Sequence, residues 1–309
     1  MIEIKNLSKK FGNNTVLDDI SFSVKTGEVL GFLGPNGAGK STTMKIITSF
    51  WTPSSGEIKV DGKDIMENSI ASRKKIGYLP ETVPLYEDMR VFEYLRFVAE
   101  IRGIGRGEIK KRLSEVVEDC GLKKVVRQPI DELSKGFRQR VGLAQAIIHN
   151  PEILILDEPT TGLDPNQIAE IRNLIKKLGK EKTVIFSTHI LSEVSATCDR
   201  VVIINNGKIV SEGKPDELAA KAGSKEIIYV KIKGPKDDVF KKLNEMENAA
   251  KINIKDKESE DIYGYEIEPK PGVDLREYLS RTVTGANWSI LEFNKKNISL
   301  EDVFRELTK

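Results

Sequence analysis

The chain has 309 residues, 39% of them hydrophobic and 31% charged, and its 49 basic and 47 acidic side chains leave a formal charge of +2. This composition is typical of a globular protein of about two domains, and it excludes a disordered chain. The small net charge gives no general electrostatic reason to expect binding to nucleic acid. Because no run reaches the roughly 18 apolar residues of a membrane span and the start lacks a secretory leader, we expect a cytosolic chain.

The composition changes along the chain near residue 220. Strand-like apolar runs and helical stretches alternate before this point, whereas residues 231–270 contain 19 charged residues in 40. Small and polar residues at 219–226 mark the linker between the two parts. We therefore predict a first domain over residues 1–220 and an accessory domain over residues 226–309.

The accessory domain is predicted to be a small α+β domain. Its expected strands lie at 226–233, 250–256, 262–268 and 287–295, with helices at 236–248 and 273–284 and a closing helix from Ser299. This βαββαβ order is that of ferredoxin-like domains. The mixed charges of the domain favour a solvated face over a binding tract, and we expect it to support dimerisation.

A glycine-rich segment in the first domain carries the clearest chemical signal. Residues 34–41 read GPNGAGKS, which matches the phosphate-loop pattern G-x-x-x-x-G-K-[ST], and they lie between an apolar strand and a helical stretch. Backbone N–H groups of such a loop hold polyphosphate oxygens, while Lys40 reaches the outer phosphates and the Ser41 hydroxyl ligates magnesium. A purely structural glycine turn is the weaker alternative.

Two acids follow the apolar run at residues 153–156. Asp157 and Glu158 end a strand that is expected to be buried on both faces, at the edge where ligands bind in α/β sheets. We predict that Asp157 holds the magnesium and that Glu158 is the general base for the attacking water. The alternative, two solvated acids at a strand end, is weaker beside a phosphate loop.

Further motifs extend this pattern in a fixed order. The segment LSKGFRQR at 133–140 precedes the two acids by the interval seen in ATP-binding cassette proteins. It is joined by YLPE at 78–81, GLD at 162–164 and the strand FSTHI that holds His189. With these motifs, residues 2 to about 218 resemble the ATPase subunit of an ABC transporter.

The resemblance implies an α/β P-loop NTPase fold of the ABC type, with a mixed sheet core and a helical subdomain at about 85–150. It implies ATP and Mg²⁺ as cofactors, with Ser41, Asp157 and Glu81 as magnesium ligands and Glu158 and His189 as catalytic residues. The implied ATP-binding residues are Phe11, Gly34, Pro35, Asn36, Gly37, Ala38, Gly39, Lys40, Ser41, Thr42, Glu81, Ser134, Gly136 and Asp164.

In this family, two subunits share each bound ATP. The resemblance places Phe11 against the adenine ring and His189 at the γ-phosphate. It places Ser134 and Gly136 at the γ-phosphate of the ATP held by the other subunit, and Asp164 at the phosphate loop of that subunit. One subunit is therefore expected not to complete its own site.

Three residues depart from the family pattern. Lys135 and Phe137 replace a Gly and the Gln of the LSGGQ signature, which puts the Gln hydrogen bond across the dimer in question. Glu81 stands where the family has Gln. Its carboxylate either meets the magnesium or only links the ATP site to the membrane partner.

The motif set is similar to that of ABC-2 type transporters, including gliding-motility-associated, multidrug and polysaccharide exporters. The implied function is ATP hydrolysis by a dimer, expected to be a homodimer, that drives a separate integral membrane permease from the cytoplasmic face of the membrane. Residues 82–101 are expected to form the groove for the permease. Within it, Val83, Leu85 and Tyr86 either contact the permease or pack in the core.

Two other functions fit the sequence less well. A soluble mechanochemical ATPase acting on ribosomes or DNA is the main alternative, but such chains carry two cassettes or one that is split by a coiled coil. This chain has one set of motifs and no heptad run, so no nucleic-acid partner is expected. A nucleotide sensor without turnover is disfavoured by the presence of Glu158 and His189.

Overall fold

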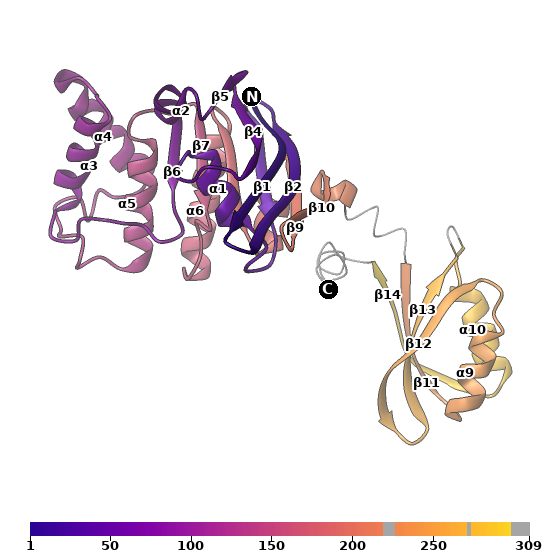
Figure 1. The fold of residues 1–309 in the computed structure, drawn as a ribbon. Coiled ribbons are helices and arrows are strands. Elements are labelled where there is room, and N and C mark those ends of the chain that lie inside the picture. The colour runs from indigo at the N-terminus through magenta and orange to yellow at the C-terminus, as the bar shows by residue number, and fades with distance from the viewer. Residues whose placement is uncertain (219–225, 271–272, 298–309) are drawn as a thin grey trace. The chain divides into compact units, whose positions relative to one another are not determined.

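The computed structural model describes residues 1–218, 226–270 and 273–297 (Figure 1). The chain divides into two compact units, one of residues 1–215 and one that begins at Asp216. The closing helix predicted from Ser299 and most of the predicted linker at 219–226 lie outside the described residues.

A six-stranded sheet of order β10-β9-β3-β8-β7-β6 forms the centre of the first unit. Its strands are β3 (Val29–Leu33), β6 (Ile76–Leu79), β7 (Ile153–Asp157), β8 (Thr183–Thr188), β9 (Arg200–Asn205) and β10 (Lys208–Gly213). All neighbours pair in parallel except β10, which runs antiparallel to β9. Strands β3, β7 and β8 are buried at every residue, which explains their continuous apolar sequences.

A second, antiparallel sheet of order β2-β1-β4-β5 lies beside the first. It contains β1 (Ile2–Phe11), β2 (Asn14–Val24), β4 (Ser55–Val60) and β5 (Lys63–Asp64). Helix α1 (Lys40–Ile47) contacts both sheets, and its Met44 shares one buried apolar cluster with Ile4 of β1 and Ile185 of β8. The mixed sheet core that the sequence predicts is confirmed by these two sheets.

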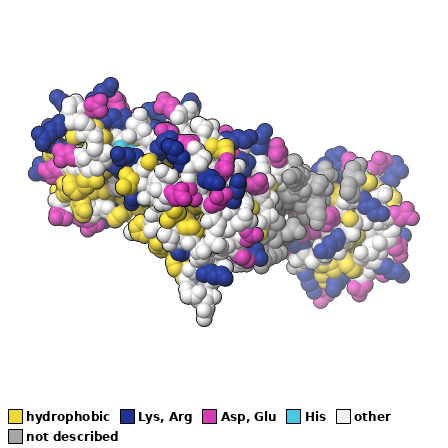
Figure 2. Space-filling view, turned by 45° about the horizontal axis from the view of Figure 1, so that its top comes forward, with side chains coloured by type: hydrophobic (Ala, Val, Ile, Leu, Met, Phe, Trp, Pro, Cys, Tyr) yellow, Lys and Arg dark blue, Asp and Glu magenta, His cyan; other side chains and the backbone are white. Residues whose placement is uncertain are grey.

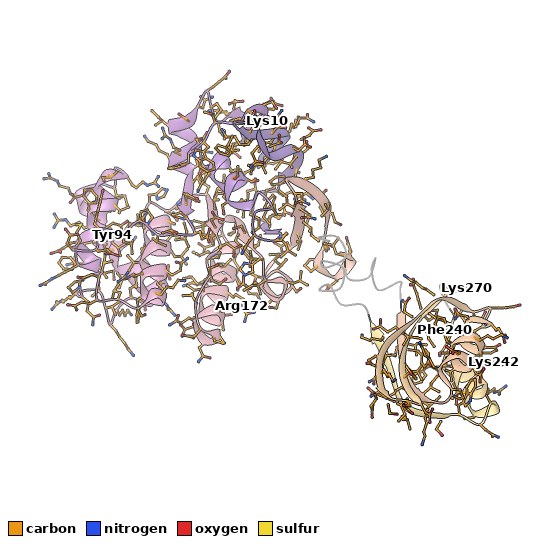
Figure 3. All side chains as sticks on the ribbon, turned by 60° about the horizontal axis from the view of Figure 1, so that its bottom comes forward. Lys10, Tyr94, Arg172, Phe240, Lys242 and Lys270 are labelled. Carbon is orange, nitrogen blue, oxygen red and sulfur yellow. The ribbon has the colours of Figure 1, made fainter. Side chains whose placement is uncertain are left out.

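The remaining helices of this unit are α2 (Ser69–Lys75), α3 (Val91–Ile101), α4 (Arg106–Asp119), α5 (Lys135–Ile147), α6 (Pro165–Gly179) and α7 (Leu191–Thr197). Helices α3, α4 and α5 pack together at one end of the unit, within the range expected for the helical subdomain (Figure 1). Tyr94 of α3 donates its hydroxyl to Gln145 of α5 and ties the two helices together (Figure 3). Among the described residues, no helix has the length and apolar content needed to cross a bilayer.

The expected groove at residues 82–101 has two kinds of side chain. Val83 and Leu85 are partly buried and pack against the apolar cluster of the helical part. Tyr86 is 57% exposed and stacks edge-on with Tyr94 and Phe97. Apolar side chains gather on the surface of the part of the molecule that holds α3 and α4 (Figure 2). Tyr86 is therefore free to contact a partner.

The second unit contains a four-stranded antiparallel sheet of order β12-β13-β11-β14. Its elements are β11 (Glu226–Lys233), α9 (Lys236–Asn244), β12 (Ala249–Ser259), β13 (Ile262–Pro269), α10 (Arg276–Gly285) and β14 (Ser289–Asn297). Both helices cover the same face of the sheet (Figure 1). The chain order and strand order are those of a ferredoxin-like domain, which confirms that prediction. Helix α9 ends earlier than predicted, at Asn244, and β12 runs three residues further, to Ser259.

Candidate functional site

The glycine-rich segment forms a loop between the end of β3 and the start of α1. Gly37 and Gly39 have φ angles of 81° and 107°, in the left-handed region that side chains disfavour. A Cβ atom on Gly39 would lie 2.6 Å from Leu17 Cδ2, and one on Gly34 would collide with the Ile204 carbonyl oxygen. The loop can therefore approach its neighbours only with glycine at these positions. The N-terminal end of α1 is left facing the concave side of the loop.

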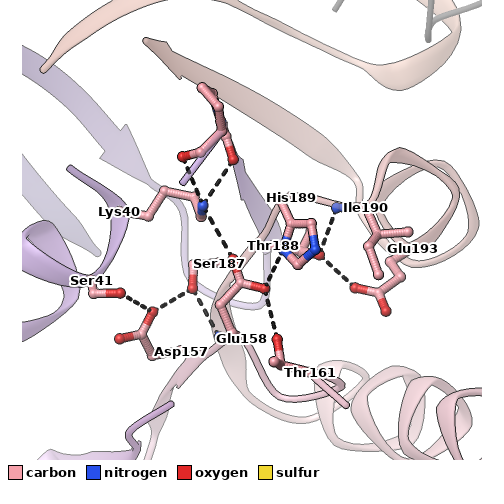
Figure 4. Close-up of polar contacts among 12 residues, drawn as sticks. Lys40, Ser41, Asp157, Glu158, Thr161, Ser187, Thr188, His189, Ile190 and Glu193 are labelled. Atoms are coloured by element: carbon pink, nitrogen blue, oxygen red, sulfur yellow. Dashed lines mark hydrogen bonds and ion pairs between the residues drawn. The ribbon is translucent and has the colours of Figure 1, made fainter. Parts of the chain in front are cut away.

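Lys40 is buried at the first turn of α1, with 5% of its surface exposed. Its ammonium donates to the carbonyl oxygens of Gly34 at 2.8 Å and Pro35 at 3.1 Å (Figure 4). It also lies 3.2 Å from Glu158 Oε1. The charge of Lys40 is thus held over the loop, between the predicted phosphate position and the predicted general base.

Asp157 ends β7 beside the start of α1. Its Oδ1 atom accepts hydrogen bonds from Ser41 Oγ at 3.0 Å and from Ser187 Oγ at 2.6 Å (Figure 4). Its Oδ2 atom is buried and has no hydrogen-bond partner. Burial raises the pKa of this carboxyl, although the two serine hydroxyls favour its charged form. An unpartnered carboxylate oxygen next to a serine hydroxyl is a donor set that suits Mg²⁺.

Glu158 is held in a strained and almost fully buried position. Its φ is 48°, a left-handed value that costs a non-glycine residue roughly 1–2 kcal/mol. The Ser187 hydroxyl accepts its backbone N–H at 2.9 Å. Its Oε2 atom accepts from Thr161 Oγ1 at 3.1 Å and lies 2.9 Å from His189 Nδ1. Backbone and side chain are both fixed, which aims the carboxylate at Lys40 and His189.

His189 directly follows β8, and 40% of its side chain is exposed. The preceding Thr188 donates to Glu193 Oε2 at 2.6 Å and accepts the Ile190 N–H at 3.0 Å, so the turn that carries the imidazole is tied on both sides. The structure therefore brings Lys40, Glu158 and His189 into one cluster, as the sequence predicts.

Three supporting residues were not assigned a role from the sequence: Ser187, Thr161 and Glu193. The signal for Ser187 was present, because a hydroxyl inside a fully buried strand needs a partner. Thr161 lies three residues after Glu158 and Glu193 lies five residues after Thr188, and each contact depends on how the chain turns there.

A surface pocket opens on this cluster. Its lining residues are Val16, Asn36, Gly37, Gly39, Lys40, Ser41, Thr42, Glu81 and Glu158. Glu81 is thus brought to the phosphate loop, in agreement with the expected site. Phe11 does not line this pocket. Phe11 is 43% exposed, and its ring packs edge-on against that of Trp51, with 5.0 Å between the ring centroids. The Lys9 ammonium lies 4.9 Å from the centroid of the Phe11 ring.

Ser134, Gly136 and Asp164 form a separate cluster within one chain. Ser134 caps α5 by accepting the Phe137 N–H, and Asp164 caps α6 by accepting the Gln167 N–H at 2.9 Å. Gly136 lies against the end of the Gln167 side chain, which would have to move to admit a Cβ atom at this position. None of the three lines the phosphate pocket. Phe137, the departure from the signature Gln, packs its ring against the helical core.

Comparison with known proteins agrees with this geometry. The family model described as "ABC transporter" matches residues 17–161. The linearmycin resistance ATP-binding protein LnrL of Bacillus subtilis is 33% identical over 100% of this chain and 98% of its own length. The probable multidrug ABC transporter ATP-binding protein YbhF of Escherichia coli is 39% identical over 73% of this chain, but this is only 39% of its own length.

A solved structure of a similar cassette is a dimer. An ATP-binding cassette in a post-hydrolysis state, bound to ADP and Pi, superposes with a TM-score of 0.64 at 28% identity, over 69% of this chain and 98% of that chain. The site geometry, the full-length similarity to LnrL and this superposition lead to one conclusion. The chain belongs to the ABC transporter ATP-binding proteins and is an ABC-type ATPase.

Proposed function

We propose that this protein is the energy-coupling subunit of an exporter, in which ATP-driven closure and opening of a homodimer moves a separate membrane permease. The single observation that carries the catalytic part is the position of Glu158, fixed between the phosphate-loop Lys40 and His189. The names of two relatives, a resistance protein and a probable multidrug protein, support the export direction.

The contacts of Lys40 suggest how nucleotide binding prepares the general base. Without a phosphate, the buried ammonium is neutralised by Glu158 at 3.2 Å. The β- and γ-phosphates offer Lys40 stronger and more numerous acceptors, so their binding draws it away from Glu158. The released carboxylate then takes a proton from the attacking water, while His189 stays within hydrogen-bond distance of Glu158.

The metal site is proposed from the same residues. Ser41 and the unpartnered oxygen of Asp157 would hold Mg²⁺, with Glu81 at the rim of the pocket. When bound, Mg²⁺ neutralises charge on the β- and γ-phosphate oxygens. Ser187 keeps Asp157 oriented toward it through the 2.6 Å hydrogen bond.

The dimer is proposed because three of the predicted ATP contacts lie away from the phosphate loop and its pocket. Ser134, Gly136 and Asp164 are all placed at the N-terminal ends of α5 and α6, where backbone N–H groups favour an anion. A second copy that presents these helix ends to the pocket completes the site. The dimeric cassette structure supports this arrangement.

Co-purification of the trapped complex tests this proposal. A tagged Glu158→Gln chain is purified with ATP from detergent-solubilised native cells, and the proteins that accompany it are identified and quantified. We expect one polytopic membrane protein in fixed proportion to the tagged chain. Recovery of ribosomes or nucleoprotein without a membrane protein would overturn the transporter function and leave the ATPase chemistry in place.

A further inference from the structure

Two residues that depart from the family pattern carry opposite charges. Glu81 stands in place of a Gln and Lys135 in place of a Gly, so each departure introduces one charge. Both side chains are exposed. In the part of the chain that the structure describes, neither side chain takes part in an ion pair or a hydrogen bond. Each charge is therefore available to a partner from outside the chain.

Glu81 is the acid of the phosphate pocket that lacks a cation. Among the described residues that line this pocket, Lys40 is the one cation, and Glu158 is the second acid. The Lys40 ammonium lies 3.2 Å from Glu158 Oε1, so its charge is already paired. A negative charge thus remains at Glu81 before any phosphate binds. Because a bound triphosphate adds more negative charge, a second cation at this rim would be stabilising.

Lys135 belongs to the other cluster, where it lies between Ser134 and Gly136 in the sequence and begins α5. Its side chain crosses Gly162, because a Cβ atom on this glycine would collide with the lysine ammonium and lie 3.0 Å from its Cε atom. Gly162 has φ 73° and no side chain, which leaves room for the lysine. The Lys135 ammonium is therefore held beside the segment that leads to Asp164.

Asp164, the acid of this cluster, is engaged with its own helix. Its carboxylate accepts the Gln167 N–H at 2.9 Å at the start of α6, where the helix dipole also favours a negative charge. No ion pair joins Asp164 to Lys135 among the described residues. Lys135 thus adds a positive charge to a surface whose acid is already stabilised.

The proposed dimer brings the two unpaired charges to the same place. Ser134 and Gly136 are expected at the ATP that a second copy holds in its phosphate pocket, and Glu81 lines that pocket. Since Lys135 lies between these two residues, it meets the same pocket, with the long flexible stem of a lysine. In a symmetric dimer the same encounter occurs twice.

We propose that Lys135 of each copy forms an ion pair with Glu81 of the other copy in the ATP-bound dimer. This rests on the proposed function, because it names a contact between the two copies of the proposed homodimer. The contact compensates the charge that Lys40 leaves unpaired in the pocket. It also explains the two departures together, since a Gln and a Gly have no charges to pair.

A double-mutant cycle in the Glu158→Gln background tests this contact. Light scattering with ATP measures the dissociation constant of the dimer for the chain with both charges, for Lys135→Gln, for Glu81→Gln and for the double variant. We expect Lys135→Gln to weaken the dimer about tenfold or more when Glu81 is present, but less than about twofold in the Glu81→Gln chain. High salt should reduce the first effect.

Lys180→Gln is the matched control, because Lys180 is exposed and lies at the opposite end of α6 from Asp164. We expect this control to dimerise normally. ATP binding by the Lys135→Gln monomer should be unchanged, since its own pocket is intact, and this shows that the variant folds. An equal cost of Lys135→Gln with and without Glu81 would overturn the ion pair and leave the proposed dimer standing. Failure of the Glu158→Gln chain to dimerise with ATP would overturn both.

A zero-length crosslink locates the contact directly. A water-soluble carbodiimide activates a carboxylate, and an ammonium group in contact with it then forms an amide after losing its protons, while the reagent leaves as a urea. In the Glu158→Gln chain we expect an ATP-dependent crosslinked dimer in which mass spectrometry finds Lys135 joined to Glu81. The Lys135→Gln chain should not give this product. Crosslinking of Lys135 to a different acid, with Glu81 left unjoined, would overturn the proposal.

Discussion

The phosphate-loop cluster and the cluster at the ends of α5 and α6 differ in how completely one chain builds them. Around the phosphate loop, Lys40, Asp157, Glu158 and His189 are joined by hydrogen bonds and ion pairs that span β3, β7 and β8. The polar groups of the other cluster only cap their own helices. The difference indicates that one chain already positions the residues around the phosphate loop. The contacts expected from the ends of α5 and α6 have to come from a second copy.

The largest expected effect comes from removing the general base. Glu158→Gln keeps the size of the side chain but cannot accept a proton, so we expect ATP turnover to fall about a hundredfold or more while ATP binding is retained. Steady-state hydrolysis and nucleotide binding measured on the same preparation check this prediction. Unchanged turnover would remove Glu158 from its assigned role.

Ser134→Arg tests the cluster at the ends of α5 and α6. The bulky cation keeps the pocket of its own chain intact but obstructs the surface that a second copy must reach. We expect nucleotide binding to persist and ATP-dependent dimerisation to be lost, with turnover lower by about tenfold or more because the complete site does not form. Size-exclusion chromatography with light scattering, in the Glu158→Gln background with ATP, measures the dimer. A normal ATP-dependent dimer of this variant would contradict the claim that a second copy binds at the ends of α5 and α6.

Ser187→Ala tests the phosphate-loop cluster, because Ser187 positions Asp157 and Glu158 but contacts no predicted substrate atom. Its loss removes one of two hydrogen bonds to Asp157 and leaves the Glu158 N–H unpartnered, a cost of about 1–3 kcal/mol. We expect kcat to fall about tenfold and the Mg²⁺ concentration for half-maximal activity to rise. Ser195→Ala, whose hydroxyl bonds only the Leu191 carbonyl oxygen, is the control. An equal effect of both substitutions would refute the positioning role.

The smallest expected effect is on the pH dependence of folding stability. It comes from His149, which lies outside both clusters. Burial, and then the charge of Arg102, lowers the pKa of His149 to about 4 from 6.5. The unfolded chain binds more protons between these values, so this residue lowers the stability as the pH falls from about 6.5 to 4. We expect His149→Gln to lose fewer degrees of Tm over that interval than the unsubstituted chain. Parallel thermal melts at pH 7 and pH 5 measure the difference.

Much of the catalytic cluster could be predicted from the sequence because its residues lie in short, continuous segments. Lys40 and Ser41 belong to one loop, and Asp157 and Glu158 end one buried strand. The parallel order of the strands then brings these ends to one edge of the sheet. The ferredoxin-like order of the second unit was equally predictable, since a strand such as β11 alternates the buried apolar residues Ile228, Val230 and Ile232 with more exposed ones.

Other features depend on contacts between distant segments and were not predictable. A surface pocket that is lined by Phe50, Arg73, Tyr78 and Arg102 joins the end of α1 with residues of α2, β6 and the turn after α3, and no spacing in the sequence links them. The same applies to Val83, whose partial burial follows from its packing on Gly142 of α5. Domain boundaries and the dimer-supporting role of the accessory domain stay predictions.

The central claim is that one chain holds the chemistry but two chains make the site, and mixing two inactive chains tests it most directly. Lys40→Ala disables the phosphate loop and leaves the ends of α5 and α6 intact, whereas Ser134→Arg does the reverse. In a mixed dimer, the phosphate loop of the Ser134→Arg chain meets the intact helix ends of the Lys40→Ala chain, so one of the two shared ATP sites is complete. We therefore predict that the mixture recovers up to about a quarter of the unsubstituted activity. A mixture as inactive as its two components, or full activity of the Ser134→Arg chain alone, would contradict the account.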